Sequence, residues 1–366
     1  MKLVCDGLDL SEALLKVSKG TSTKTTTPIL EGIKLIAEED HLTLSATDLE
    51  LSIEKTIKAD VHIEGQTVVP GKLFSEYIKK LNDEQIELNL DEHNILTIRY
   101  TDSMGKIQCY DANEFPQIKQ LDYAESFILT QRDLRALINK SVFAVATEDS
   151  RPILKGVKLE IENGEIHAVA LDGYRIAVVN KKLSRATANF SVIVPARSLV
   201  EIAKLLEDND DNVQVFVQKN HLMVNINNTK ITTRLLDGDF VNYKQIIPNN
   251  FTTTVILNKV QLEDALDRAS LLSRVDKNNL VRFDITEKLM VLSAKSEIGD
   301  VKENITIALH GNDLSIAFNA RYLTEALRST EDEFLKLSFK SSIAPCIITP
   351  NESEEFLFLI APVRIS

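Results

Sequence analysis

The chain has 366 residues, of which 44% are hydrophobic and 26% are charged, and its formal net charge is −12 at pH 7. These values exclude a disordered chain and suit about three globular domains of ordinary size. No apolar run is long enough to span a bilayer, and residues 1–10 lack the apolar core of a signal peptide. Taken alone, the acidic charge argues against nucleic acid as a partner.

The three cysteines, Cys5, Cys109 and Cys346, lie far apart in the sequence. Their number is odd and their spacing fits no metal site. We therefore expect reduced thiols in a cytoplasmic protein.

The first third of the chain begins with a short strand and a predicted helix over Ser11–Lys19. Residues 27–53 alternate apolar and polar side chains, which predicts strands. Pro70 is placed to start a helix over Lys72–Leu81, and two further strands come before residues 114–116.

The middle third follows the same order. Gly156–Ile161 and Glu165–Ala170 each alternate apolar and polar residues, and Asn163-Gly164 between them predicts a hairpin because both turn residues tolerate positive φ. A second turn at 171–173 leads into a strand over Tyr174–Val179. The predicted helices of this third are Gln131–Lys140 and Ala196–Leu206.

The last third follows the segment 235–248. Its predicted helices are Lys259–Ala269 and Ala320–Ser329, and a fainter copy of the hairpin pattern lies in Leu280–Ile298. We therefore expect each third to contain two β-rich halves with one helix each.

The three thirds are related by a constant offset. Residues of the first copy recur 124 positions later, since Pro28, Leu30, Gly32 and Asp48 match Pro152, Leu154, Gly156 and Asp172. A second element recurs in step with the first, as Val69–Leu73, Val194–Leu199 and Phe318–Leu323. One offset shared by several anchors predicts three tandem copies of one domain.

Charge is unevenly distributed between the predicted elements. The six predicted helices hold 14 Lys and Arg against 8 Asp and Glu, a net of +6, so the rest of the chain must carry −18 to reach the total of −12. Two explanations remain open. The helices face a polyanion, or Lys and Arg are there because they are good helix formers on a solvated surface.

No motif predicts catalysis. The six histidines are scattered singly without a zinc-hydrolase pairing, and 104–107 lacks the glycine and hydroxyl residues of a phosphate loop. Asp208–Asn212 has acidic calcium-loop spacing, but Val213 stands where glycine is needed. We therefore expect no catalytic residue, no metal and no cofactor.

Six short segments occur in order along the chain: 46–50, 171–178, 192–195, 238–243, 246–248 and 362–364. Together they resemble the bacterial DNA polymerase III beta subunits, the sliding-clamp family. Each segment is a weak motif by itself, but their order and the agreement in length make the resemblance specific.

The resemblance implies an α+β fold of three tandem DNA-clamp domains over 1–122, 123–249 and 250–366. It implies a head-to-tail homodimeric ring with inward helices and outer sheets, which encircles double-stranded DNA without reading its sequence. Positions that match DNA-facing residues of the family are Lys24, Lys72, Lys79, Arg197 and Lys204, and each is equally explained as a solvated surface cation. Gln245 stands where some members carry arginine.

The resemblance also implies an apolar groove between the second and third domains that binds short peptides. Its partners would be the polymerase III catalytic subunit, the clamp loader and other replication and repair proteins. For Leu154 and Ile176, plain core packing is a rival explanation. The matching positions are Leu154, Leu171, Gly173, Tyr174, Arg175, Ile176, Val241, Ile246, Leu359, Ala361, Pro362, Val363 and Arg364.

Ring closure would pair an edge strand of the first domain, over 105–110, with the third domain. The residues expected at this dimer interface are Ile107, Cys109, Leu271 and Leu272. The expected protein is thus cytoplasmic, associated with the nucleoid and not with a membrane, and not an enzyme. A peptide-binding scaffold that ignores DNA and a hydrolase with an unrecognised carboxylate pair are the alternatives.

Overall fold

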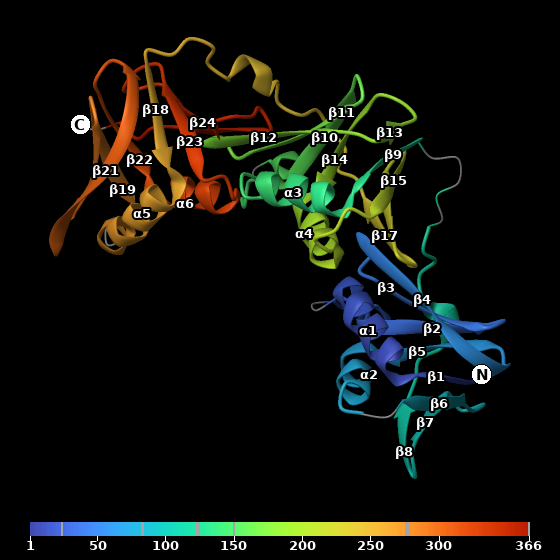
Figure 1. The fold of residues 1–366 in the computed structure, drawn as a ribbon. Coiled ribbons are helices and arrows are strands. Elements are labelled where there is room, and N and C mark those ends of the chain that lie inside the picture. The colour runs from blue at the N-terminus through green and yellow to red at the C-terminus, as the bar shows by residue number, and fades with distance from the viewer. Residues whose placement is uncertain are drawn as a thin grey trace. The chain divides into compact units, whose positions relative to one another are not determined.

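The fold is described from a computed structural model, which covers residues 1–22, 25–81, 84–119, 121, 125–148, 151–274 and 279–364. These residues form two compact units (Figure 1). The first unit is 1–130 together with 204–235, and the second is 131–203 together with 236–366. Among the described residues, no helix is long and apolar enough to cross a membrane.

The described part of the first unit contains two helices and a larger set of strands. The helices are α1 (Gly7–Val17) and α2 (Gly71–Ile78). The strands are β1 (Lys2–Asp6), β2 (Gly32–Glu38), β3 (His41–Thr47), β4 (Leu51–Ile63), β5 (Gly65–Pro70), β6 (Gln85–Leu90), β7 (Ile95–Tyr100), β8 (Ser103–Gln108), β9 (Glu125–Thr130), β15 (Asn212–Gln218), β16 (His221–Ile226) and β17 (Thr229–Arg234), where β15 to β17 come from the later segment.

The second unit contains the other helices. They are α3 (Gln131–Val142), α4 (Ala196–Leu205, of which the last two residues belong to the first unit), α5 (Lys259–Ser273) and α6 (Ala320–Arg328). The strands are β10 (Gly156–Glu162), β11 (Glu165–Leu171), β12 (Arg175–Lys182), β13 (Arg185–Ala186), β14 (Phe190–Pro195), β18 (Thr253–Asn258), β19 (Leu280–Thr286), β20 (Leu289–Ser296), β21 (Gly299–Gly311), β22 (Leu314–Asn319), β23 (Phe334–Phe339), β24 (Cys346–Pro350) and β25 (Phe356–Ile360).

The internal repeat is present in the structure with the predicted offset. The strands β2, β10 and β19 begin at positions 32, 156 and 280, and β4, β12 and β21 begin at 51, 175 and 299. The hairpin turn between β10 and β11 is built as predicted, with φ of 53° at Asn163 and 79° at Gly164. The faint third copy is therefore a true structural repeat, formed by β19 and β20.

The predicted helices exist, but their ends shift. The first begins at Gly7 and not at Ser11, because the Asp6 carboxylate accepts the backbone N–H groups of Leu8 and Asp9 at 2.9 and 3.0 Å. The second ends at Ile78, so Lys79 lies at its C-terminal cap. Over their observed bounds the six helices hold 11 Lys and Arg against 9 Asp and Glu, a net of only +2.

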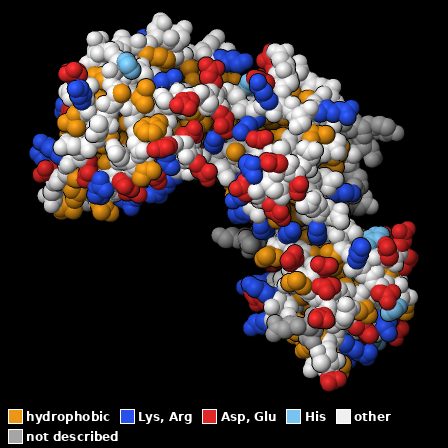
Figure 2. Space-filling model, in the orientation of Figure 1, with side chains coloured by type: hydrophobic (Ala, Val, Ile, Leu, Met, Phe, Trp, Pro, Cys, Tyr) orange, Lys and Arg blue, Asp and Glu red, His pale blue; other side chains and the backbone are white. Residues whose placement is uncertain are grey.

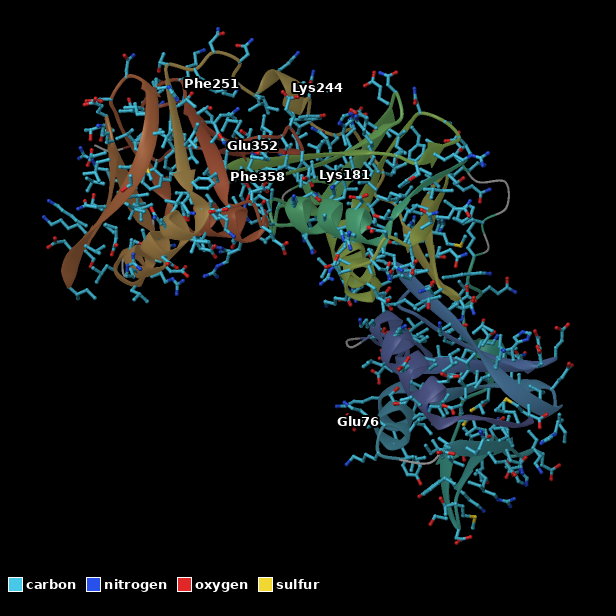
Figure 3. The ribbon with its side chains drawn as sticks, viewed as in Figure 1. Glu76, Lys181, Lys244, Phe251, Glu352 and Phe358 are labelled. Atoms are coloured by element: carbon cyan, nitrogen blue, oxygen red, sulfur yellow. The ribbon has the colours of Figure 1, made fainter. Side chains whose placement is uncertain are left out.

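Antiparallel ladders join repeats of the chain. In the first unit β17 pairs with β4, with Ile231 opposite Ile53. In the second unit β25 pairs with β12, with Phe358 opposite Ala177 (Figure 3). Because β12 also pairs with β11 and β25 with β24, one continuous sheet crosses from the second copy of the repeat into the third. In this unit α3, α5 and α6 lie on the same side of the strands (Figure 1).

Candidate functional site: an apolar groove in the second unit

A groove with a volume of about 560 Å³ opens in the second unit. Its floor is apolar and its rim carries charge. The residues that line it are Ala146, Thr147, Glu148, Arg151, Leu154, Leu171, Asp172, Gly173, Tyr174, Val241, Ile246 and Tyr322. Six of the predicted groove positions are therefore brought together: Leu154, Leu171, Gly173, Tyr174, Val241 and Ile246.

The floor of the groove is also core. Leu154 and Leu171 are each 4% exposed and pack in one cluster with Ile176 and Leu359, which do not line the opening. The rival explanation of core packing therefore describes Ile176 better, whereas Leu154 both packs in the core and faces the groove. Val241, only partly buried, covers this cluster from the connecting segment.

An aspartate turn shapes the rim. The Asp172 Oδ1 atom accepts the backbone N–H groups of Tyr174 and Arg175 at 2.9 and 3.0 Å. Gly173, between Asp172 and Tyr174, has φ of 97°, a left-handed conformation that suits glycine. The turn leaves the Tyr174 side chain 61% exposed, stacked on the aromatic ring of Tyr322 with 5.9 Å between centroids and 22° between planes.

The stacked rings of Tyr174 and Tyr322 form a wall of the groove. Arg175 lies behind this wall and does not line the groove. Its side chain is 4% exposed, its Nε donates to Asp172 Oδ2 at 2.9 Å, and its Nη1 donates to Glu325. Its guanidinium carbon lies 4.8 Å from the centroid of the Tyr322 ring and 5.5 Å from that of Phe143. Arg175 is a predicted groove position, but its burial places it behind the lining and not in contact with the opening.

The carboxylate that pairs with Arg175 is ionised at neutral pH, whereas two of the tyrosines around the groove are neutral. Burial alone would raise the pKa of the Glu325 carboxyl, but hydrogen bonds from Arg321 and Arg175 outweigh it and hold the pKa below its ordinary value. Burial, together with the negative charge of Asp172, raises the pKa of the Tyr322 hydroxyl. Burial also raises the pKa of Tyr243, which packs in the groove cluster, to about 12. These two tyrosines therefore stay neutral, and Glu325 stays ionised at neutral pH.

The C-terminal segment runs beside the groove. The Ala361 N–H donates to the Tyr174 carbonyl at 2.8 Å, and the Val363 N–H donates to the Ala317 carbonyl at 2.8 Å. Ala361, Pro362 and Val363 are half-buried and Arg364 is exposed, and none of them lines the cavity itself.

Sequence reasoning missed part of the lining. Tyr322 lies within the third copy of the helix-start repeat, 318–323, and Asp172 is one of the repeat anchors, so both carried a signal that could have marked them. The others lie in or beside a connecting segment, where no periodicity marks a lining position. The missed residues are Ala146, Thr147, Glu148, Arg151, Asp172 and Tyr322.

At the end of β12 that lies away from the groove, a group of charges joins β12 to α3 and to the residue before β25. The Glu355 carboxylate accepts from Lys140 Nζ and Lys181 Nζ, both at 2.9 Å, and Lys181 Nζ also lies 2.9 Å from Asp133 (Figure 3). Burial alone would raise the pKa of Glu355, but the hydrogen bonds from Lys140 and Lys181 hold it below its ordinary value.

We expect this group to make stability depend on pH. A carboxyl with a lowered folded-state pKa stabilises the fold above its unfolded pKa, about 4.3, and loses that contribution as the pH falls through the folded pKa. A Glu355→Gln variant should therefore be less stable at pH 7 by about 1 kcal/mol, since the site is partly solvated. Thermal unfolding followed by circular dichroism at pH 7 and pH 3 measures this.

The loss of stability relative to the unchanged chain should become smaller toward pH 3. An equal loss of stability at pH 7 and pH 3 would contradict the role of Glu355. Glu352→Gln is the matched control, because Glu352 is exposed in the same loop and makes no ion pair among the described residues (Figure 3).

The predicted DNA-facing cations are surface residues. Lys72 and Lys79 are exposed at the two ends of α2, and neither makes an ion pair within the described part of the chain. Arg197 and Lys204 are exposed on α4. Lys24 lies outside the described residues.

Cations on the helices of the third repeat are already paired. Arg268 bonds Glu303 at 2.8 and 2.7 Å, and Arg328 bonds Asp267 at 2.9 Å. Figure 2 shows Lys and Arg together with Asp and Glu on this part of the surface. The helices are thus less uniformly basic than the sequence predicts, chiefly because Lys19, Lys79 and Lys80 lie beyond helix ends.

The predicted interface residues differ in exposure. Leu271 is 68% exposed near the end of α5, and Leu272 beside it is half-buried. Ile107 and Cys109 are 8% and 6% exposed, so their side chains pack inside their own domain. Among described strands β8 pairs with β7 alone, which leaves its other backbone edge open.

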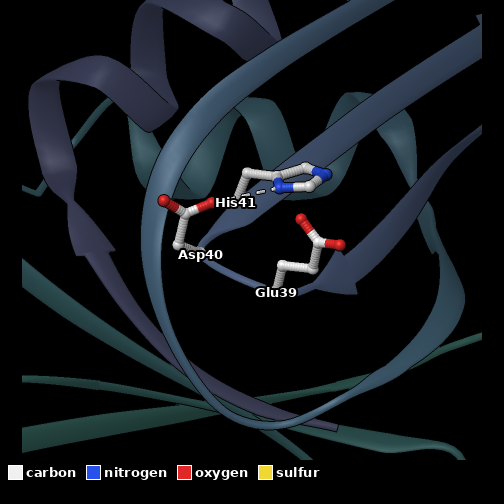
Figure 4. Close-up of side chains that lie close together, drawn as sticks. All are labelled: Glu39, Asp40 and His41. Atoms are coloured by element: carbon white, nitrogen blue, oxygen red, sulfur yellow. Dashed lines mark hydrogen bonds and ion pairs between the residues drawn. The ribbon is translucent and has the colours of Figure 1, made fainter.

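One group among the described residues has the donor spacing of a metal site. Ligand atoms of Glu39, Asp40 and His41 lie within 4.8 Å of one another (Figure 4). Glu39 and Asp40 form the turn between β2 and β3 and are exposed, and His41 is the first residue of β3, with its Nδ1 3.4 Å from Asp40 Oδ1. Solvated acidic turns of this kind are common, and we assign no metal to it.

Comparison with known proteins covers the whole chain. Family models described as the N-terminal, central and C-terminal domains of the DNA polymerase III beta subunit match residues 1–119, 128–242 and 244–364. A curated "Beta sliding clamp" of Bacillus subtilis (strain 168) is 33% identical over 377 residues, with 100% of both chains covered. That of Halalkalibacterium halodurans is 33% identical over 362 residues, with 95% of each covered.

Solved structures agree with these sequence matches. The DNA polymerase sliding clamp from Bacillus subtilis superposes with a TM-score of 0.97 at 31% identity, covering 100% of both chains. The beta subunit from DNA polymerase of Streptococcus pyogenes superposes with a TM-score of 0.96 at 29% identity, again over 100% of both chains.

Proposed function

Because the chain belongs to the DNA polymerase III beta subunit family, and so is a DNA sliding clamp, we propose that two copies close head to tail into a ring that has no catalytic activity of its own. The ring encircles duplex DNA and carries the polymerase. The observation that carries the proposal is that the same strand junction is built twice within the chain and left open at a third place.

The two built junctions are alike. In each junction, one strand is the last strand in the first half of a repeat, and its partner is the last strand in the second half of another repeat. The two pairs are β4 with β17 and β12 with β25. The third pair of this kind is β21 with β8. Among the described residues, β21 pairs only with β18 and β20, and β8 only with β7. Open strand edges favour pairing with another chain.

The repeat gives the register of the open junction. The hairpins β7–β8 and β16–β17 correspond at an offset of 126, since Ile95 pairs with Gln108 as His221 pairs with Arg234. Transfer of the β4–β17 register places Val301 opposite Gly105 of the partner subunit, and Asp300 opposite Lys106 of the partner subunit. Opposite charges at facing positions stabilise such a pair of strands.

The same correspondence between repeats predicts a side-chain contact across the third junction. Tyr174, just before β12, stacks on Tyr322, the third residue of α6. Ile298, just before β21, corresponds to Tyr174, and Leu73, the third residue of α2, corresponds to Tyr322. Ile298 and Leu73 are 70% and 54% exposed, which suits an apolar contact that forms between copies.

Exposed lysines would face the phosphates of the encircled duplex. We expect a Lys72→Gln/Lys79→Gln variant to lower the slope of log affinity for DNA against log salt by about 2, one phosphate contact for each lysine. Fluorescence anisotropy of a labelled duplex, titrated at several salt concentrations, measures the slope. Lys244→Gln is the control, since Lys244 is exposed in the segment connecting β17 and β18 (Figure 3). An unchanged slope in the double variant would remove Lys72 and Lys79 from the DNA-facing set.

The groove of the second unit is the docking site for short segments of the polymerase, the clamp loader and other replication and repair proteins. Its apolar floor, formed by Leu154, Leu171 and Val241, suits an aliphatic or aromatic anchor, and the exposed Ile246 and Tyr174 extend the apolar surface.

The decisive experiment separates topology from affinity. The protein is loaded by a clamp loader onto a nicked circular plasmid and passed over a sizing column in high salt, which removes ordinary phosphate contacts. We expect retention on the circle and release after one cut of the plasmid. Loss from the intact circle in salt, with an active loader, would favour the peptide-binding scaffold instead.

A further inference from the structure

The buried guanidinium of Arg175 has a role that the docking function alone does not assign. We propose that Arg175 is a positioning residue that sets the width of the groove, and with it the preference for a leucine anchor over an aromatic one. It does so by holding the Tyr322 ring against Tyr174. This inference rests on the docking function proposed above.

The first support is geometric. The Arg175 guanidinium lies over the ring of Tyr322 and also over that of Phe143, and Tyr322 in turn stacks on Tyr174. Tyr174 itself is 61% exposed, so few other groups fix it. A planar cation against an aromatic face is attracted by it, more strongly when the cation is desolvated, as here.

The second support is an internal comparison. Asp48 in the first repeat builds the same turn, accepting the N–H groups of Glu50 and Leu51 at 3.0 and 2.7 Å. Leu51 stands where Arg175 stands in the second repeat, and it is 2% exposed. An arginine is therefore not needed to form the turn or to fill the site, and its presence beside the groove indicates another role.

The third support is the placement of charge. Two arginines share the Glu325 carboxylate: Arg175, which is buried, and Arg321, which is 63% exposed and bonds it at 2.7 Å. Glu325 thus remains paired if Arg175 is replaced. Of these two arginines, Arg175 is the one whose guanidinium lies over the Tyr322 ring, so Arg321 offers a matched control on the same carboxylate.

The consequence is a wall of fixed position. With Tyr322 held, Tyr174 stays over the rim and the groove keeps one width above Leu171 and Val241. Without the guanidinium, Tyr174 is free to swing into solvent. The groove then loses a contact with a small anchor and gains room for a large one.

The test compares two synthetic peptides of one sequence, with a leucine or a phenylalanine anchor, on the full-length protein by isothermal titration calorimetry. We expect Arg175→Lys to weaken the leucine peptide about tenfold and the phenylalanine peptide less than about threefold, because lysine keeps the charge but not the planar stack. Arg321→Gln should leave the ratio of the two affinities unchanged.

A second variant and a second measurement distinguish a change in specificity from misfolding of the Arg175→Lys protein. Tyr322→Leu introduces the residue type that α2 carries at the corresponding position, Leu73, and should shift the ratio in the same direction. The chain has 7 tyrosines, so tyrosine-labelled NMR spectra are simple enough to follow the Tyr174 ring, assigned with Tyr174→Phe. Its signal should move in Arg175→Lys and not in Arg321→Gln.

The outcomes are distinct. An unchanged ratio and an unmoved Tyr174 signal in Arg175→Lys, with normal binding by the unchanged chain, would overturn the inference and leave docking intact. If the unchanged chain binds neither peptide, the docking proposal fails and the specificity proposal fails with it.

Discussion

An Ile298→Asp variant is expected to be monomeric under conditions in which the unchanged chain forms the proposed dimer. Loss of a buried isoleucine contact costs about 1.5–3 kcal/mol, and a carboxylate facing Leu73 of the partner subunit adds desolvation. A head-to-tail dimer contains two identical junctions, so a cost of about 2.7 kcal/mol at each raises the dissociation constant by about 10⁴. Sedimentation velocity should give 41.0 kDa for the variant and about twice that mass for the unchanged chain.

The control is Ile343→Asp. Ile343 is also 70% exposed, but it lies between β23 and β24, two strands that take no part in the proposed third junction. The Ile343→Asp variant should form the dimer as the unchanged chain does. The register has its own test, because Lys106→Glu should weaken the dimer and Lys106→Glu/Asp300→Lys should recover it. A dimeric Ile298→Asp protein would show that the third junction does not copy the second.

An Ile246→Asp variant is expected to lose peptide docking without losing the ring. Ile246 is 45% exposed and lines the groove, so a carboxylate there faces any apolar anchor that enters. The lost apolar burial and the desolvated charge together cost about 2.7 kcal/mol, which is about 100-fold in affinity. Calorimetry with the leucine-anchor peptide measures the loss, and primer extension on a long template should show short products.

Phe251→Asp is the matched control for this prediction. Phe251 is 40% exposed, lies five residues further along the same connecting segment, and does not line the groove (Figure 3). It should bind peptide normally. If both variants bind equally well, the docking surface lies elsewhere on the chain.

Much of the fold follows from local patterns. The 124-residue offset and the Asn163-Gly164 turn depend on few neighbours, so they are readable without a structure, and the folded chain contains both. The predicted start of α1 is wrong because Asp6-Gly7 looks like a turn, whereas the Asp6 carboxylate caps the helix. The position of a helix end decides which charged residues belong to the helix, and this is why the net charge of the helices falls from a predicted +6 to +2.

The sequence predicts the place of the groove but not its detail. Leu154 and Leu171 are apolar at positions that the resemblance marks, and both line it. The role of Arg175 could not be read from sequence, because its partner Phe143 directly follows α3, its partners Tyr322 and Glu325 lie on α6, and only the folded chain brings these elements together around it. A charged residue in a motif suggests ligand contact, and only its burial shows that it supports the wall.

The junction between β12 and β25 also has a mechanical meaning. Five residue pairs from Arg175–Ile360 to Val179–Phe356 are joined by a ladder of backbone hydrogen bonds. A force along the strands must break these bonds together, whereas a force across one end breaks them in succession, each at a net cost of about 1 kcal/mol. In the proposed ring, no connecting segment would cover the copy of this ladder between subunits. A protein that pulls on one end of that ladder would therefore open it and leave the two internal junctions paired.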